Sequence, residues 1–147
     1  STPTMKLTTR GHYSVKAMLD MSLKPHLASV KLIAQRQNLP APYLEKLLIQ
    51  LRRAGLVESV RGARGGYRLA KAPSQIYLGQ ILDAVGEPIT PLQLSAPEKA
   101  EDWVTLTLWR RLQEKLRDVL YSISLEELNY DARSWLAAQG EETNFLV

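Results

Sequence analysis

The stretch that decides the fold reads Pro42-Tyr43-Leu44-Glu45-Lys46-Leu47-Leu48-Ile49-Gln50-Leu51-Arg52-Arg53-Ala54-Gly55-Leu56-Val57-Glu58-Ser59-Val60-Arg61-Gly62-Ala63-Arg64-Gly65-Gly66-Tyr67-Arg68-Leu69. Leu44, Leu47, Leu48 and Leu51 recur at the spacing of one helix face, which predicts a helix from Pro42 to about Ala54. Gly55 can end that helix, because glycine readily adopts the left-handed conformation after a last turn. A strand over 56–60, a tight glycine-rich loop over 61–66 and a returning strand over 67–69 follow.

Two further helices are predicted before this stretch. Thr8 precedes a helix over about 9–23, with apolar residues at helical spacing, and Pro25 stops it. Ser29 can cap a short helix over 30–37, and residues 38–40 form a turn. The order helix, short helix, turn, helix, hairpin is typical of a winged helix-turn-helix, whose third helix lies in the major groove of DNA. We therefore expect a mainly α protein with a small β-hairpin, in which residues 5–85 form the DNA-binding domain.

A second region is expected after residue 85. Residues 76–77 suggest a short strand, and residues 78–85 a short helix. Residues 86–102 contain three prolines and suggest a loop. A long helix over about 103–122 and a last helix that starts with a capping box at 124–127 follow, so residues 103–138 form a helical region and residues 139–147 a flexible tail.

The long helix carries apolar residues at spacings of 3, 4, 3 and 4, which is a heptad seam. The seam could be buried within one chain, but a domain this small has little core left to cover it. The spacing therefore favours a homodimer held through Trp109, Leu112, Leu116, Val119 and Ile123.

Charge is distributed unevenly along the chain. Residues 1–75 hold 13 basic and 3 acidic residues, a balance of +10, whereas residues 76–147 hold 6 basic and 12 acidic residues, a balance of −6. A basic half beside an acidic half indicates a polyanionic partner for the first half and one preferred orientation of approach to double-stranded DNA. Apolar runs long enough for a membrane span are absent from the sequence, and so is a charged-then-apolar signal segment, so we expect a cytoplasmic protein without a membrane partner.

The composition also limits the chemistry. The sequence has no cysteine, which excludes disulfides, thiolate-held metals and a cysteine nucleophile. Its two histidines, His12 and His26, are fourteen positions apart and make a poor metal site. Because paired histidines and a carboxylate dyad at defined spacing are also absent, we expect no enzyme and no catalytic residues.

The helix over 42–54 is the candidate recognition helix. Glu45 is the only acidic residue from Val30 to Val57. A lone carboxylate facing DNA phosphates is best tolerated where it accepts a hydrogen bond from a cytosine amine. The alternative, which stays open, is that Glu45 pairs with a neighbouring lysine or arginine.

The loop over 61–66 has three readings. A nucleotide-binding P-loop is excluded, because Gly-Lys-Ser/Thr is missing at its end. A plain hairpin turn is the second reading. Arg61 and Arg64 favour the third, a wing on DNA, since arginine is attracted by the negative potential of a narrow minor groove.

Several segments resemble the Rrf2-type transcription regulators, in particular the branch that binds iron–sulfur clusters. They are residues 5–13, 43–47, 51–57, 59–62 running into 65–67, 108–110 and 124–128. The resemblance implies a homodimer with crossing long helices, base reading by Glu45, and a minor-groove arginine at Arg61, with Tyr43 and Lys46 beside the reading position. The predicted DNA-contacting residues are Arg10, Tyr13, Tyr43, Glu45, Lys46, Arg53, Arg61 and Arg64.

The chain departs from this branch in the loop before the long helix. Cluster-binding members carry three cysteines there and often a fourth ligand at the start of the helix. Here Trp103 and Leu106 stand where the last two ligands align. The scattered carboxylates that remain do not hold such clusters, so we expect no iron–sulfur cluster and no other metal.

Without a cluster, the signal could be a small-molecule effector or a partner protein. A winged-helix protein–protein adaptor is the competing hypothesis. It would predict an uncharged wing, and Arg61, Arg64 and Arg68 argue against it.

Overall fold

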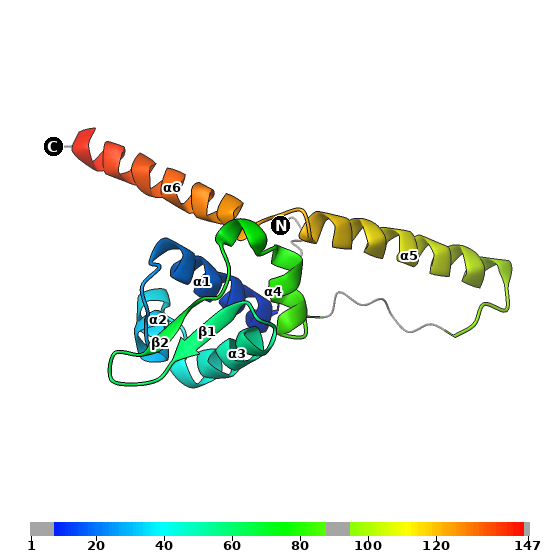
Figure 1. Cartoon of the computed structure of the whole chain (residues 1–147). Helices are drawn as coiled ribbons and strands as arrows, with labels where there is room; N and C mark the ends of the chain where they lie inside the picture. The colour runs from blue at the N-terminus through cyan, green and yellow to red at the C-terminus, as the bar shows by residue number, and fades with distance from the viewer. Residues whose placement is uncertain (1–7, 88–94, 146–147) are drawn as a thin grey trace.

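The computed structural model describes residues 8–87 and 95–145 and contains a winged helix-turn-helix, as the sequence predicts (Figure 1). Its elements are α1 (Thr9–Leu23), α2 (Val30–Gln37), α3 (Ala41–Arg53), β1 (Val57–Val60), β2 (Gly66–Leu69), the 3-10 turn η1 (Pro73–Gln75), α4 (Leu78–Ala84), α5 (Ala100–Leu120) and α6 (Leu125–Phe145). Elements α1 to α4 and the hairpin form one compact body. Helices α5 and α6 extend away from it in opposite directions (Figure 1).

The helix ends follow from local sequence. The side chain of Thr8 accepts a hydrogen bond from the N–H of Gly11, and that of Ser29 accepts one from Leu32, which satisfies otherwise unpaired donors at the starts of α1 and α2. Asn38 ends α2 with φ of 56°, and Gly55 follows α3 with φ of 77°. Both are residue types that tolerate the left-handed conformation, so the chain turns where the sequence predicts it.

One hydrophobic core holds the body together. The leucine stripe of α3 is buried, and it packs with residues from α1, α2 and α4. Burying side chains of this size contributes about 1.5–3 kcal/mol each, so this stripe fixes the orientation of α3 and leaves its opposite face in solvent. The largest buried residues of the core are Met18, Met21, Ile33, Leu44, Leu47, Leu48, Leu51, Leu56, Ile76, Ile81 and Leu125.

The hairpin carries a third extended segment that the sequence did not predict. Strands β1 and β2 pair antiparallel, and Ala28 pairs with Tyr67 on the other side of β2 through hydrogen bonds of 3.1 and 2.8 Å. A Cβ on Gly66 would lie 2.4 Å from the carbonyl oxygen of Ala28. A glycine is therefore required where the hairpin meets the segment before α2, and this contact anchors the base of the wing.

A buried ion pair joins α1 to α2. The Asp20 side chain accepts hydrogen bonds from Arg36 Nε at 3.1 Å, Arg36 NH2 at 2.5 Å and Gln37 Nε2 at 2.7 Å. Asp20 is 1% exposed, and Lys24 Nζ lies 3.7 Å from it at the surface. A buried carboxylate is tolerated only with such partners, so these bonds set the packing of the two helices.

The region after α4 differs in its boundaries from the expectation. Helix α5 begins at Ala100 instead of Trp103, because Asp102 caps its first turn, and it ends at Leu120. Helix α6 continues to Phe145, beyond the expected start of a tail at Gln139. Parts of the expected divisions lie outside the described residues: the start of the DNA-binding domain at 5–7, the middle of the loop at 88–94 and the last two tail residues. Across the described ranges, no helix is long and apolar enough to cross a membrane.

Candidate nucleic-acid interface

The exposed face of α3 forms a shallow groove with the first turn of α1. The groove has a volume of about 380 Å³ and is open to solvent. Its lining residues are Arg10, Tyr43, Lys46, Leu47, Ile49, Gln50 and Arg53. The structure thus brings four of the eight predicted DNA-contacting residues into one basic surface. Ile49 and Gln50 also line it, as expected from their place opposite the buried stripe.

Aromatic packing holds Tyr43 at the edge of this groove. Tyr13 of α1 lies edge-on to Tyr43, with ring centroids 5.9 Å apart and planes at 82°. Such T-shaped pairs add stability beyond the area they bury. Tyr13, which is one of the predicted DNA-contacting residues, is half-buried and packs against Tyr43, and Tyr43 is exposed to solvent.

Arg10 connects the groove to the end of α4. Its guanidinium lies close to Gly86, where NH1 is 3.9 Å from the position of an added Cβ. Within the described part of the chain, its buried Nε atom has no hydrogen-bond partner. The Arg10 side chain therefore lies between the end of α4 and the groove, whose lining it supplies with a positive charge.

Glu45 lies on the first turns of α3 and is exposed. Among the described residues, the ion pairs are formed by Asp20, Glu58 and Asp83, so none of them involves Glu45. Its carboxylate is exposed next to Lys46 in the chain, but Glu45 is not among the residues that line the groove. This geometry removes the support for the alternative in which Glu45 pairs with a neighbouring cation.

The wing carries two exposed arginines on a glycine-rich turn. Arg61 and Arg64 lie between β1 and β2, and the turn is closed by a 3.0 Å hydrogen bond from Gly65 N to Gly62 O. Gly62 has φ of 117°, which favours glycine. Arg68 is different, because its Nε lies 2.5 Å from Glu58 Oε1 on the paired strand. The charge of Arg68 is thus partly neutralised, and the free basic charge of the wing lies at its tip.

The heptad seam is uncovered in the single chain. Trp109, Leu112, Leu116 and Val119 are 45, 48, 37 and 54% exposed, and Ile123 is half-buried. Trp103, Val104 and Leu108 are further exposed apolar residues toward the start of α5. Exposed apolar surface of this kind marks an interaction site in most soluble proteins.

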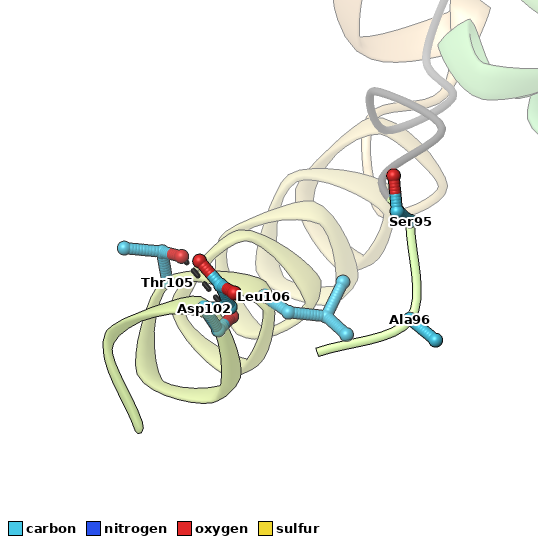
Figure 2. Close-up of a pocket in the computed structure, with 5 residues that line it drawn as sticks. All are labelled: Ser95, Ala96, Asp102, Thr105 and Leu106. Atoms are coloured by element: carbon cyan, nitrogen blue, oxygen red, sulfur yellow. Dashed lines mark hydrogen bonds between the residues drawn. The ribbon is translucent and has the colours of Figure 1, made fainter. Parts of the chain in front are cut away.

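The described part of the loop before α5 does not fit an iron–sulfur cluster. A hollow of about 200 Å³ lies at this place, and its lining residues are Ser95, Ala96, Asp102, Thr105 and Leu106 (Figure 2). Asp102 Oδ2 already accepts hydrogen bonds from the N–H groups of Glu98 and Lys99 at 3.3 and 3.2 Å. The Thr105 hydroxyl donates to backbone carbonyls of the same helix.

The donor chemistry of the whole loop leads to the same result. Clusters are held by thiolates and, less often, by imidazole, and residues 88–94 read Pro-Ile-Thr-Pro-Leu-Gln-Leu, which supply neither. Among the described residues there is no group of three or more histidine, cysteine or carboxylate side chains that could hold a metal ion. The residues present therefore do not fit an iron–sulfur cluster, the cofactor that the resemblance noted in the sequence would imply.

Glu87 is a structural residue that the sequence did not reveal. It is 8% exposed, and its carboxylate accepts hydrogen bonds from the Thr8 N–H at 2.9 Å and from the Thr8 hydroxyl at 2.6 Å. A Cβ on Gly11 would lie 2.8 Å from Glu87 Oε1. The start of the loop is therefore bonded to the start of α1, within the turn that carries Arg10. These partners are 79 residues apart, so no local pattern could have indicated the contact.

Comparison with known proteins places this architecture in a family. The model of the Rrf2 family, described as iron-dependent transcriptional regulators, matches residues 7–131. The protein slr0846 of Synechocystis sp., provisionally named as an HTH-type transcriptional regulator, is 61% identical over 97% of this chain and 100% of its own length.

Two solved structures are similar to this chain in both fold and sequence. IscR of T. potens matches with a TM-score of 0.72 and 40% identity, covering 87% of this chain and 88% of that one. CymR, described as the global cysteine regulator of B. subtilis, matches with a TM-score of 0.74 and 37% identity, covering 86% and 98%. With a family model over most of the chain and relatives well above 30% identity, the chain belongs to the Rrf2 family of helix-turn-helix transcription regulators.

Proposed function

We propose that this protein is a sequence-specific DNA-binding regulator that acts as a homodimer on a pseudo-palindromic operator. Helix α3 would lie in the major groove and the wing, residues 61–66, in the neighbouring minor groove. The observation that carries the proposal is the groove of Arg10, Tyr43, Lys46 and Arg53 on the exposed face of α3. Three cations on one rigid face provide the phosphate contacts that dominate affinity for DNA.

Base discrimination is assigned to a smaller set of side chains. Glu45 can accept from a cytosine amine at a base edge, and Gln50 can pair with adenine. Arg61 is assigned to the minor groove and Arg64 to phosphate. This division follows the general rule that phosphate contacts position a protein, whereas base contacts specify the sequence.

The acidic second half of the chain favours one orientation of the protein as it approaches DNA. Because residues 76–147 carry a balance of −6, phosphate repels them and attracts the helix-turn-helix. The uncovered seam on α5 supports pairing of two chains, which would present two copies of α3 to two half-sites. The named relatives are bacterial, and bacterial DNA lies in the cytoplasm. A transcription regulator must reach that DNA, so we place the protein in the bacterial cytoplasm.

We further propose that regulation does not use an iron–sulfur cluster. The support is the donor set of the loop before α5, whose Asp102 carboxylate caps the helix instead of facing a metal. A small molecule or a partner protein would then carry the signal.

Selection of bound DNA from a random pool, read by sequencing, tests the proposal. We expect two half-sites related by a twofold axis at a fixed separation, with binding that weakens steeply as salt increases. A single unpaired half-site would argue against the dimer. Binding of all sequences with equal affinity would argue against specific recognition.

A further inference from the structure

Helix α5 meets the body mainly through its C-terminal end. Leu120 is 8% exposed and packs against Leu82 of α4, with Val15 and Leu78 beside them. The Leu78 N–H donates to the carbonyl of Ile123 at 2.8 Å. The rest of α5 projects from the body in Figure 1. The direction of the whole helix is therefore decided at its last turns.

Three side chains, which we call the Asp83 latch, bridge α4 and α5 at this point. The Tyr121 hydroxyl donates a hydrogen bond to Asp83 Oδ2, and Arg117 NH2 lies 3.4 Å from the same oxygen. The Arg117 guanidinium carbon is 5.2 Å from the centre of the Tyr121 ring, a cation–π distance. One carboxylate on α4 thus holds two side chains from successive turns at the end of α5.

The shape of α4 is matched to this contact. The ring of Tyr121 lies against Gly79, where a Cβ would be 2.3 Å from the ring carbon Cδ2. Any larger residue at position 79 would push the ring away. Both the polar contact and the close approach therefore specify one position of the tyrosine on α4.

The latch contributes little to global stability. The side chains of Asp83 and Arg117 are 38 and 44% exposed, and Tyr121 is 36% exposed. Exposed ion pairs stabilise a fold only slightly, because solvent competes for both charges. A contact with low energy but well-defined geometry is suited to orienting a helix.

We infer that the Asp83 latch sets the separation of half-sites that the dimer accepts. The inference rests on the proposed function, in which the seam on α5 joins two chains. The seam would fix α5 against its copy, and the latch fixes α5 against the domain that carries α3. The distance between the two recognition helices then depends on both contacts.

Geometry makes that distance sensitive to the latch. A helix of 21 residues is about 30 Å long. A tilt of about 10° at one end moves the other end by roughly 5 Å, which exceeds the rise of about 3.4 Å per base pair. Residues that never touch DNA would therefore select the spacing of the operator.

The test compares Tyr121→Phe and Asp83→Ala with the wild-type full chain. Tyr121→Phe keeps the ring on Gly79 and removes only the donor, so the fold is preserved. Affinity is measured for operators with identical half-sites and the selected spacer, or spacers one and two base pairs longer or shorter. Tyr130→Phe is the matched control, because Tyr130 is 64% exposed on α6.

We expect both latch variants to lose several-fold of the preference for the selected spacer over its neighbours. The dimer dissociation constant and the affinity for an isolated half-site should stay at the wild-type values, and the control should keep the wild-type preference. Unchanged spacer preference in both latch variants would overturn the inference. So would an even loss of affinity at every spacing, which would mark a purely structural role. A wild-type chain that stays monomeric or ignores paired half-sites would instead refute the proposed function.

Discussion

At the scale of single residues, Glu45 is the only acidic residue from Val30 to Val57, where every other charged residue is basic. No described ion pair neutralises it, so its placement near phosphates is unfavourable unless a base amine compensates. We predict that Glu45→Ala relaxes discrimination at one base pair by about 1–3 kcal/mol. Competition binding with operators changed at single positions measures this.

Lys46→Ala is the matched control for Glu45, because Lys46 is the adjacent exposed residue and lines the basic groove. Lys46→Ala should weaken binding to all DNA sequences evenly and reduce the slope of the logarithm of the binding constant against the logarithm of the salt concentration by about one. If Glu45→Ala weakened nonspecific DNA as much as the operator, base reading by Glu45 would be refuted.

The two arginines of the wing are expected to act differently. A minor-groove arginine prefers narrow A·T-rich segments, whereas a phosphate contact is indifferent to sequence. Gly62 beside Arg61 leaves room for insertion into the groove, since an added Cβ would meet nothing within 4 Å there. We predict that Arg61→Ala loses the preference for A·T under the wing, while Arg64→Ala weakens binding evenly.

Salt titrations on two operators, one A·T-rich and one G·C-rich under the wing, measure this difference. Arg68→Ala serves as the control, because Arg68 is paired with Glu58 and should change little. Equal loss on both operators for Arg61→Ala would mean that Arg61 contacts only the backbone.

At the scale of elements, the sequence predicts those features that depend on interactions between residues close together in the chain. The caps at Thr8 and Ser29, the turn at Asn38 and the buried stripe of α3 depend on residues within a few positions of each other. Contacts between distant segments left no such pattern: the pairing of Ala28 with Tyr67, the Glu87–Thr8 contact and the latch at Asp83 all join residues more than about 30 positions apart. The basic face of the site was predictable from its helix, but the supports behind Arg10 and Tyr43 were not.

The joint between α1 and α2 gives a stability test at this scale. Removing the carboxylate of Asp20 leaves the guanidinium of Arg36 without its buried partner, at 22% side-chain exposure. We predict that Asp20→Ala lowers the free energy of unfolding by roughly 3 kcal/mol in chemical denaturation. Lys24→Ala removes the exposed partner of the same carboxylate and should cost less than about 1 kcal/mol. Equal effects of the two variants would show that burial of this pair is not what matters.

At the scale of the whole molecule, the chain keeps the Rrf2 architecture but has no cysteine with which to hold an iron–sulfur cluster. We predict that protein purified without oxygen is colourless and contains neither iron nor labile sulfide, because neither thiolate nor a suitable imidazole lies in residues 86–106. Iron and sulfide analysis with a visible spectrum measures this. Stoichiometric iron with cluster absorbance would contradict it.

In the proposed dimer, α5 would gain a partner for its seam, which in the single chain exposes a tryptophan, two leucines and a valine to water. A second chain would bury these residues and bring two DNA-binding domains to one operator. Placing a charge in the middle of the seam, as in Leu116→Glu, should therefore give monomers and weaken operator binding by about 100-fold, because bivalent binding is lost. Arg110→Glu places an acidic group on another side of the same helix and should leave the dimer intact. Light scattering gives the mass, and a stable dimer in the double variant Leu112→Glu/Leu116→Glu would exclude this seam as the interface.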